Sequence, residues 1–152
     1  MSRRDQIRMT PDEVDAFLHG RRTMTVGTVG RDGQPHLVAM WYGFVDGAPA
    51  FWTYARSQKV TNLRRDPRIS ALVESGAAYE ELQGVELVGT GVVLDDPDSV
   101  MAVGRSVMER YSGPYTDEMR PVLERSSAKR VAIRIDVTRV VSWDHRKLGG
   151  AY

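Results

Sequence analysis

A series of short extended segments, each ended by a tight-turn signal, constrains the fold of this chain more than any other sequence feature. Residues 22–30 are rich in Thr and Val, and a Gly-Arg-Asp-Gly turn signal separates them from a second extended segment, residues 35–45. Asp46-Gly47 is a further turn signal, and the aromatic segment 48–55 follows it. This spacing predicts three consecutive antiparallel strands joined by tight turns.

Three later segments extend this pattern and add curvature. Residues 68–74 predict a fourth strand, and residues 81–94 predict a long fifth strand that contains glycines at positions 84, 89 and 91. Glycines inside a strand are typical of bulges and bends, which curl a sheet. Between residues 131 and 138 large apolar side chains alternate with polar or small ones, which predicts a half-buried final strand. A meander with built-in curvature predicts a barrel.

Helical signals frame these strands. Thr10 and Glu13 form a capping box around Pro11, which predicts a helix over residues 11–19. The segment before Pro67 is expected to hold a short helix, and two further helices are expected over about 95–111 and about 116–129. The predicted fold class is α+β, with a six-stranded, mostly antiparallel barrel and peripheral helices.

Length and composition set the remaining bounds. The 152 residues, 41% of them hydrophobic, suit one domain over 1–152, with 1–9 and 149–152 expected to be flexible tails. Lys and Arg number 21 against 20 for Asp and Glu, so the overall charge favours neither nucleic acid nor membrane as a partner. Cysteine is absent and no apolar run approaches the ~18 residues of a membrane span, so we expect a soluble cytoplasmic protein.

The sequence lacks the common catalytic and metal-binding motifs. His19, His36 and His145 have no paired ligand spacing, so no metal site is predicted. No nucleophile elbow, P-loop or dinucleotide-binding glycine motif occurs. We therefore predict no catalytic side chain, and expect a bound cofactor to carry the chemistry if the protein is an enzyme.

The most unusual segment is 55–68, which holds five Arg or Lys residues against one Asp, in a chain whose formal net charge is +1. Hydroxyl, ammonium and amide groups gather where the preceding strand ends, on Thr53, Tyr54, Ser57, Lys59 and Asn62. Together with free backbone N–H groups in the turn, they predict an anion site. A phosphate there would gain several charge-assisted hydrogen bonds, each contributing about 1.5–3 kcal/mol.

The block TYARSQKVTNLRRDPR at 53–68, after a helix and three strands and before the glycine-bearing VELVGTGVV, resembles a known superfamily. It is similar to the split β-barrel flavin- and deazaflavin-binding proteins related to pyridoxamine 5′-phosphate oxidase, and most similar to the actinobacterial branch that uses coenzyme F420. The resemblance runs from about Thr10 to Leu148. It implies a split β-barrel and a homodimer with the cofactor between its subunits.

The resemblance also implies which residues contact the cofactor. The residues that would line the tricyclic ring are His36, Val38, Ala39, Met40 and Trp41. The residues that would hold the ribityl phosphate are Thr53, Tyr54, Ser57, Lys59 and Asn62. Trp143, in a late strand, would reach the cofactor of the other subunit.

The activity that the resemblance implies is that of a reductase, which passes a hydride from F420, or alternatively FMN, to a small conjugated or heteroaromatic acceptor. Tyr42 or a water molecule is a candidate proton donor. F420 carries an oligoglutamate tail, and the cations offered to it are Arg56, Arg64, Arg65 and the amino-terminal Arg3, Arg4 and Arg8. Arg64, Arg65 and Arg68 are equally compatible with ordinary solvated surface.

A second function stays open, since split barrels serve several uses. The chain would then bind or sequester F420, FMN or a tetrapyrrole without turnover. Oxidation of pyridoxamine phosphate itself is disfavoured, because the paired Arg and His motifs of pyridoxamine 5′-phosphate oxidase are not evident. The segment 144–147 resembles those motifs only loosely.

Overall fold

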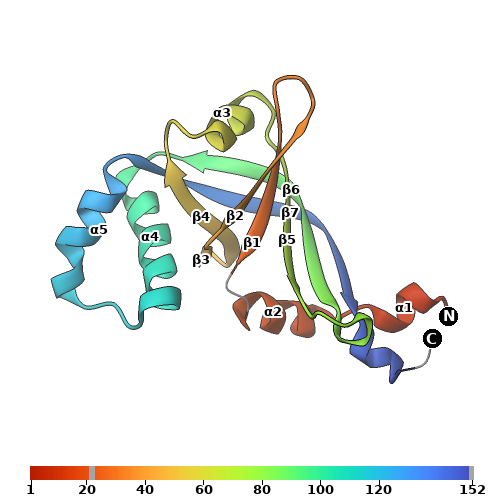
Figure 1. Cartoon of the computed structure of the whole chain (residues 1–152). Helices are drawn as coiled ribbons and strands as arrows, with labels where there is room; N and C mark the ends of the chain where they lie inside the picture. The colour runs from red at the N-terminus through yellow and green to blue at the C-terminus, as the bar shows by residue number, and fades with distance from the viewer. Residues whose placement is uncertain (21–22, 151–152) are drawn as a thin grey trace.

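The computed structural model describes residues 1–20 and 23–150, which are built around one curled antiparallel sheet (Figure 1). Its seven strands are β1 (Met24–Val29), β2 (Pro35–Met40), β3 (Gly43–Val45), β4 (Ala48–Tyr54), β5 (Arg68–Ser75), β6 (Gln83–Leu94) and β7 (Arg130–Asp144). Their order is β2-β1-β5-β6-β7-β4-β3, and each neighbouring pair is antiparallel. The predicted α+β class with a curved antiparallel sheet is therefore confirmed.

The predicted number of six strands was wrong by one, because the extended segment 35–45 divides into β2 and β3. β2 pairs with β1 at one edge of the sheet, and β3 pairs with β4 at the other edge. Between them the backbone N–H of Tyr42 leaves the ladder and donates to the hydroxyl of Tyr111 at 3.2 Å. Only two residues, Trp41 and Tyr42, connect opposite edges, so the sheet has to curl until those edges lie close together.

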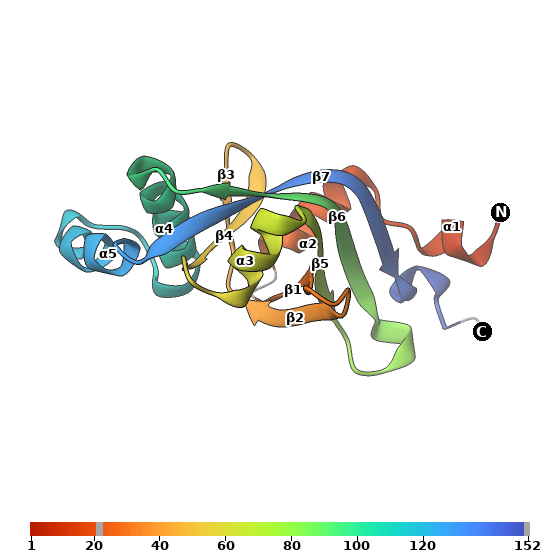
Figure 2. The same ribbon diagram turned by 90° about the horizontal axis from the view of Figure 1, so that it is seen from above.

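The helices lie around the sheet without covering it evenly (Figure 2). They are α1 (Arg3–Ile7), α2 (Pro11–Gly20), α3 (Gln58–Arg65), α4 (Pro97–Ser112) and α5 (Arg120–Ser127), with short 3-10 turns η1 (Tyr79–Glu81), η2 (Asp117–Met119) and η3 (His145–Leu148). α3 packs against β1 and β6, whereas α4 packs against β3, β4 and β7 and pairs with α5. α1 lies at the other end, near η3 and the chain termini, and α2 lies between α1 and α4 (Figure 1).

Local signals account for several element boundaries. In the predicted capping box, the Thr10 N–H donates to Glu13 Oε2 at 2.6 Å and the Glu13 N–H donates to Thr10 Oγ1 at 3.2 Å. The Asp46-Gly47 turn has positive φ at both residues, 50° and 77°, as a tight hairpin turn requires. The predicted last helix over 116–129 begins instead as the separate turn η2, and α5 itself is shorter.

The predicted curvature of β6 has a clear origin at Gly89. The register of β6 against β7 shifts between Val88 and Gly89, which is the mark of a bulge. A Cβ at Gly89 would overlap the carbonyl oxygen of Asp136 on β7. Glycine therefore allows the two long strands to approach and bend at this point.

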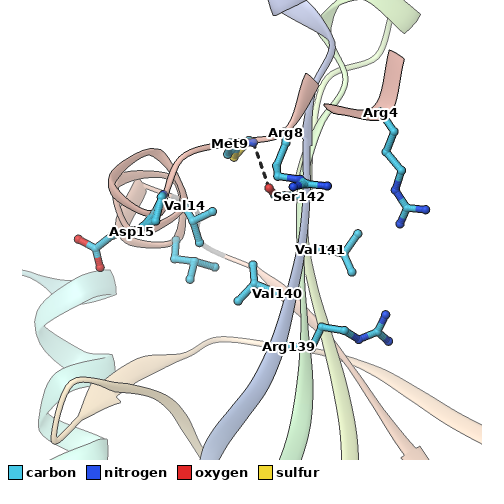
Figure 3. Close-up of a pocket in the computed structure, with 11 residues that line it drawn as sticks. Arg4, Arg8, Met9, Val14, Asp15, Arg139, Val140, Val141 and Ser142 are labelled. Carbon is cyan, nitrogen blue, oxygen red and sulfur yellow. Dashed lines mark hydrogen bonds between the residues drawn. The ribbon is translucent and has the colours of Figure 1, made fainter. Parts of the chain in front are cut away.

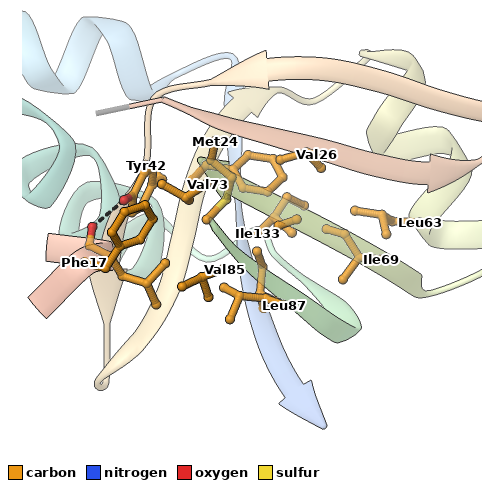
Figure 4. Close-up of a cluster of buried hydrophobic side chains, with 14 of the residues drawn as sticks. Phe17, Met24, Val26, Tyr42, Leu63, Ile69, Val73, Val85, Leu87 and Ile133 are labelled. Atoms are coloured by element: carbon orange, nitrogen blue, oxygen red, sulfur yellow. Dashed lines mark hydrogen bonds between the residues drawn. The ribbon is translucent and has the colours of Figure 1, made fainter. Parts of the chain in front are cut away.

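The core fills the inside of the curled sheet (Figure 4). It includes Met24 and Val26 of β1, Val85 and Leu87 of β6, and Val60 and Leu63 of α3, all at most 3% exposed. A second, smaller cluster lies under α4 and contains Ala50, Val100, Val103, Val107 and Ala132. Because α3 contributes to the main core, its orientation, and with it the basic segment, is fixed by apolar packing.

Both segments that were predicted to be flexible tails contain residues with regular structure. Residues 3–7 form α1, which contacts η3, and Gly149 caps η3. The last two residues of the predicted tail and the predicted strand start at position 22 lie outside the described residues. Within the described ranges, no helix combines the length and apolar character needed to cross a membrane.

Candidate functional site

The connection between β4 and α3 places a lysine ammonium inside the protein. Lys59 lies in the first turn of α3, and only 8% of it is exposed. Its Nζ donates a hydrogen bond to Thr53 Oγ1, near the end of β4, at 2.9 Å. Burial lowers the pKa of the Lys59 ammonium. Lys59 forms no ion pair within the part of the chain that the structure describes, although buried charges are usually paired.

Ser57 adds a hydroxyl beside this ammonium. It is the N-cap residue of α3, but its side chain does not cap the helix and instead accepts a 3.4 Å hydrogen bond from Thr53 Oγ1. Helix geometry leaves the backbone N–H groups of Gln58, Lys59 and Val60 without an intrahelical acceptor. The helix N-terminus, the Ser57 hydroxyl and the Lys59 ammonium together form a local environment that attracts an anion.

Asn62 holds this turn in place through buried hydrogen bonds. Its side chain is fully buried, and its Nδ2 donates to Thr28 Oγ1 on β1 at 3.0 Å. Its Oδ1 accepts from Gln58 Nε2 at 2.8 Å and from an Arg65 guanidinium nitrogen at 3.2 Å. These bonds hold α3 against β1, so Asn62 positions the turn and presents no exposed amide to a ligand.

The arginines of the basic segment divide by their partners. Arg65 also donates to the Val29 carbonyl at 2.7 Å, and Arg68 forms an ion pair with Asp66 at 2.6 Å. The side-chain hydrogen bonds from Arg68 lower the pKa of Asp66 to about 2. Arg56 and Arg64 are exposed and form no ion pair within the described residues, so they are the two arginines of this segment that remain available to a ligand, in addition to Lys59.

β2 presents the predicted ring-lining residues on two opposite faces. Its burial alternates, with His36, Val38 and Met40 half-buried on the core side and Ala39 exposed on the other. Trp41 follows on the exposed side, 57% exposed, and stacks on Tyr111 with ring centroids 4.3 Å apart. The structure therefore does not gather all five residues on one surface.

His36 connects β2 to the turn of α3. It lies directly opposite Thr28 in the β1–β2 ladder, and Thr28 is the residue that Asn62 binds. The Nδ1 atom of His36 is buried and has no hydrogen-bond partner within the described chain. The core-side residues of β2 and the phosphate-type groups of α3 are thus neighbours in one region of the molecule.

The two remaining predicted residues have different surroundings. Tyr54 is 57% exposed at the end of β4, with the Arg130 guanidinium 4.4 Å from its ring centroid. Trp143 lies near the far end of β7, where its indole covers Gly84 on β6 so closely that a Cβ at Gly84 would overlap it. α3 and the end of β7 are at opposite ends of the sheet (Figure 1), so one chain does not bring Trp143 to Lys59.

The structure also corrects the role considered for Tyr42 and adds residues that the sequence did not single out. Tyr42 is fully buried and its hydroxyl donates to the Leu18 carbonyl, which makes it part of the core and not a proton donor to a ligand. Thr28 and Gln58 complete the network around Asn62. Alternation in β1 placed Thr28 on the apolar face, where a hydroxyl needs a partner, and this was the available signal.

A curled antiparallel sheet, with a short helix that carries a buried lysine directly after β4, defines a protein of the split-barrel, pyridoxamine 5′-phosphate oxidase-like class. The family model described as pyridoxamine 5′-phosphate oxidase matches residues 10–144, and the chain belongs to this family. None of the curated proteins with which the chain was compared is significantly similar to it in sequence.

Solved structures agree with this assignment. A conserved hypothetical protein from Mycobacterium tuberculosis is 47% identical, with a TM-score of 0.94 over 100% of this chain and 95% of that chain. A structure described as an F420 reductase is 23% identical, with a TM-score of 0.64 over 83% of this chain and 94% of that one. A heme storage protein from Vibrio cholerae is 14% identical, with a TM-score of 0.68 over 87% and 94% of the two chains. The last two likenesses concern the fold alone.

Proposed function

We propose that the turn between β4 and α3 binds the phosphate of F420, with FMN as the alternative cofactor, and that the protein is a reductase. Its acceptor would be a small conjugated or heteroaromatic molecule. The fold family includes cofactor-dependent oxidoreductases, and the fold is shared with an F420 reductase. These likenesses support the proposal, and the geometry around Lys59 carries it.

The single most informative observation is that the buried ammonium of Lys59 has no ion-pair partner among the residues that the structure describes. Burying a cation is unfavourable unless a counter-charge or a set of acceptors compensates it. Thr53 supplies one acceptor, and a phosphate oxygen would supply the missing negative charge. The Ser57 hydroxyl and the free N–H groups of the first turn of α3 are donors of the type that a phosphate requires. The residues present therefore fit the phosphate of such a cofactor.

The protein's own groups would act by position and not by chemical reactivity. The bound cofactor would supply the hydride. Lys59, Ser57 and Thr53 would fix the phosphate end, while the core-side residues of β2, His36 and Val38 among them, would lie along the ring and exclude water. We also propose a homodimer in which Trp143 contributes to the site of the partner chain.

The preference for F420 over FMN depends on cations that could bind its oligoglutamate tail. Fewer of these cations lie near the proposed phosphate site than the sequence suggested. Arg56 and Arg64 lie on the segment that leads into and through α3 and are free to meet an oligoglutamate tail. Helix α1, which contains Arg3 and Arg4, instead lies at the opposite end of the molecule (Figure 1), and Arg4 and Arg8 lie beside residues 139–142 of β7. Within one chain, a preference for F420 therefore depends on Arg56 and Arg64.

Cofactor binding is tested by titrating the purified protein with F420 and with FMN while cofactor fluorescence is followed. We expect binding in the micromolar range or tighter, weakened at least ten-fold in Lys59→Ala, because a charge-assisted hydrogen bond contributes about 1.5–3 kcal/mol. Lys129→Ala, which removes an exposed lysine, is the matched control and should bind as the wild type does. If Lys59→Ala binds both cofactors with unchanged affinity, the phosphate site is not at this turn.

Catalysis is tested separately from binding. Reduced cofactor bound to the protein is mixed with a series of conjugated and heteroaromatic acceptors, and its reoxidation is compared with that of free cofactor. Acceleration by the protein supports the reductase. Tight binding of F420, FMN or a tetrapyrrole with no acceleration for any acceptor would instead support the alternative, a binding or sequestering protein.

A further inference from the structure

The connection between β2 and β3 holds an exposed aromatic ring in a fixed orientation. Trp41 lies in this connection, directly after β2, and stacks on Tyr111 of α4 with ring centroids 4.3 Å apart and ring planes 4° from parallel. Trp41 is nevertheless 57% exposed in the single chain. Because Tyr111 covers one face of the indole, this exposure comes mainly from the other face, which is called the open face of Trp41 below.

Tyr111 is itself held in place, so the orientation of the indole does not depend on a ligand. The Tyr111 hydroxyl accepts the backbone N–H of Tyr42 at 3.2 Å, and its side chain packs on the apolar cluster under α4. The neighbouring Arg110 guanidinium lies 4.6 Å from the ring centroid of Tyr42 and donates to the His19 carbonyl at 3.2 Å, which joins this turn of α4 to α2. A flat apolar surface that is ordered before binding loses little conformational freedom when a ligand covers it.

Trp41 lies at the end of β2 that is distant from the proposed phosphate site. His36, near the other end of β2, is opposite Thr28, which contacts α3 through Asn62. Trp41 follows His36 by five residues, which is about 17 Å of extended chain. A cofactor with its phosphate at Lys59 and its ring along β2 would therefore direct its ring towards the end of β2 that carries Trp41.

We propose that the open face of Trp41 binds the acceptor, and that the acceptor is a planar, electron-poor aromatic molecule. An indole has a negative π-face, which favours offset stacking with an electron-poor ring. This inference rests on the proposed function, because it assigns the acceptor of that same site. The pocket at the end of β7, next to Trp143 (Figure 3), would complete the shared site from the partner chain.

Benzonitrile and cyclohexanecarbonitrile are suitable probes, because both are uncharged and of similar size, and only benzonitrile has a planar aromatic ring. With cofactor-free protein we expect benzonitrile to bind at least about three-fold more tightly, as the contribution of an aromatic pair implies. Backbone amide signals of residues 40–43 in ¹⁵N-labelled protein give both affinities. Equal affinity for the two probes would refute stacking, and binding of neither would refute the whole inference.

The indole N–H signals show where the probe binds, since the chain has three tryptophans. Benzonitrile should shift the indole N–H signal of Trp41, which is identified by its loss in Trp41→Leu. The signals of Trp52 and Trp143 should stay in place. A shift confined to Trp143 would place the probe at the end of β7 and overturn the assignment.

Variants test the two stacked rings separately. Trp41→Leu keeps an apolar side chain and should abolish the preference for benzonitrile, whereas Tyr79→Leu, which removes another exposed aromatic ring (51% exposed), should retain it. Tyr111 is a positioning residue, so Tyr111→Phe, which keeps the stacked ring, should retain the preference and Tyr111→Leu should lower it at least two-fold. If Tyr111→Leu does not fold, the exposed Trp41→Leu decides alone. An unchanged preference in Trp41→Leu would overturn the inference.

Added cofactor distinguishes this inference from the proposed function. Saturating F420 or FMN should leave the benzonitrile-induced shift of Trp41 in place, because the acceptor and the cofactor ring occupy different surfaces. Loss of that shift would assign Trp41 to the cofactor ring, and would overturn this inference alone. Failure of both cofactors to bind, with benzonitrile still bound at Trp41, would refute the proposed function while supporting a site for planar aromatic molecules.

Discussion

Replacement of Lys59 by methionine should separate the roles of this residue in stability and in binding. Methionine keeps most of the length and apolar contact of the lysine side chain but removes the ammonium. The variant loses the 2.9 Å hydrogen bond to Thr53, and hydrogen bonds to charged groups contribute about 1.5–3 kcal/mol. It also removes a buried cation without a counter-ion, whose effective desolvation penalty is several kcal/mol. We therefore expect the ligand-free variant to be as stable as the wild type, or about 1–2 kcal/mol more stable, at pH 7.

The pH dependence gives this prediction a second, independent test. Burial lowers the pKa of Lys59 in the folded protein below the ordinary value of 10.5. Between these two pKa values the unfolded chain binds more protons than the folded chain, so the stability of the wild type rises with pH. Below the pKa that Lys59 has in the folded protein, its side chain is charged and the desolvation penalty of the buried ammonium fully opposes folding. The advantage of Lys59→Met should therefore shrink as pH rises towards 10.5.

The measurement is urea unfolding of both proteins at pH 7 and at several alkaline values, with Lys129→Met as the exposed-lysine control. Added cofactor should stabilise the wild type more than it stabilises Lys59→Met. At one hundred times its dissociation constant it stabilises the wild type by about 2.7 kcal/mol, and at the same concentration it should stabilise Lys59→Met much less. A ligand-free variant that is more than about 1 kcal/mol less stable than the wild type, with no dependence on pH, would refute the argument.

Three further variants test the framework of the fold by urea unfolding. Gly89→Ala should destabilise the protein by about 2–4 kcal/mol, because the new Cβ overlaps the Asp136 carbonyl; a cost below 0.5 kcal/mol would show that the bulge does not require glycine. Asn62→Ala should cost about 2–4 kcal/mol and weaken cofactor binding through loss of position, since it leaves buried partners unsatisfied; unchanged stability would contradict its supporting role. Side-chain hydrogen bonds from Arg146 lower the pKa of Asp144, so its contribution is present above the ordinary carboxyl pKa and is lost as pH falls through the lowered value. Asp144→Asn should therefore flatten the acid limb of the stability curve, and an acid limb identical to that of the wild type would contradict this.

Local chemistry explains which parts of the fold could be predicted from the sequence. The capping box of Thr10 and Glu13 and the Asp46-Gly47 turn depend on residues a few positions apart, and both formed as predicted. Gly89 marked the bulge because only a residue without a Cβ tolerates such an approach of two strands. The class of the fold followed from these signals, since short strands with tight turns and built-in bends have few other arrangements.

The parts that could not be predicted depend on contacts distant in sequence. The division of 35–45 into two strands is stabilised by the hydroxyl of Tyr111, 69 residues beyond Tyr42. In the sequence Arg65 was a candidate to contact the cofactor tail, but in the structure it donates to the carbonyl of Val29 on β1, 36 residues earlier in the chain. Which group such a side chain contacts depends on how distant segments pack together, so it cannot be predicted from a local sequence pattern.

The distance between Lys59 and Trp143 bears directly on the number of chains in a cofactor site. The end of β4 near α3 pairs with β7 at Arg130, and Trp143 lies about 40 Å further along that strand. One ring and its phosphate arm cannot contact both residues of the same chain. If both residues contact cofactor, the Trp143 of one chain has to serve the Lys59 site of another. A protein that elutes from gel filtration at the 17.0 kDa of a single chain, and binds cofactor with Lys59, would exclude Trp143 from the site.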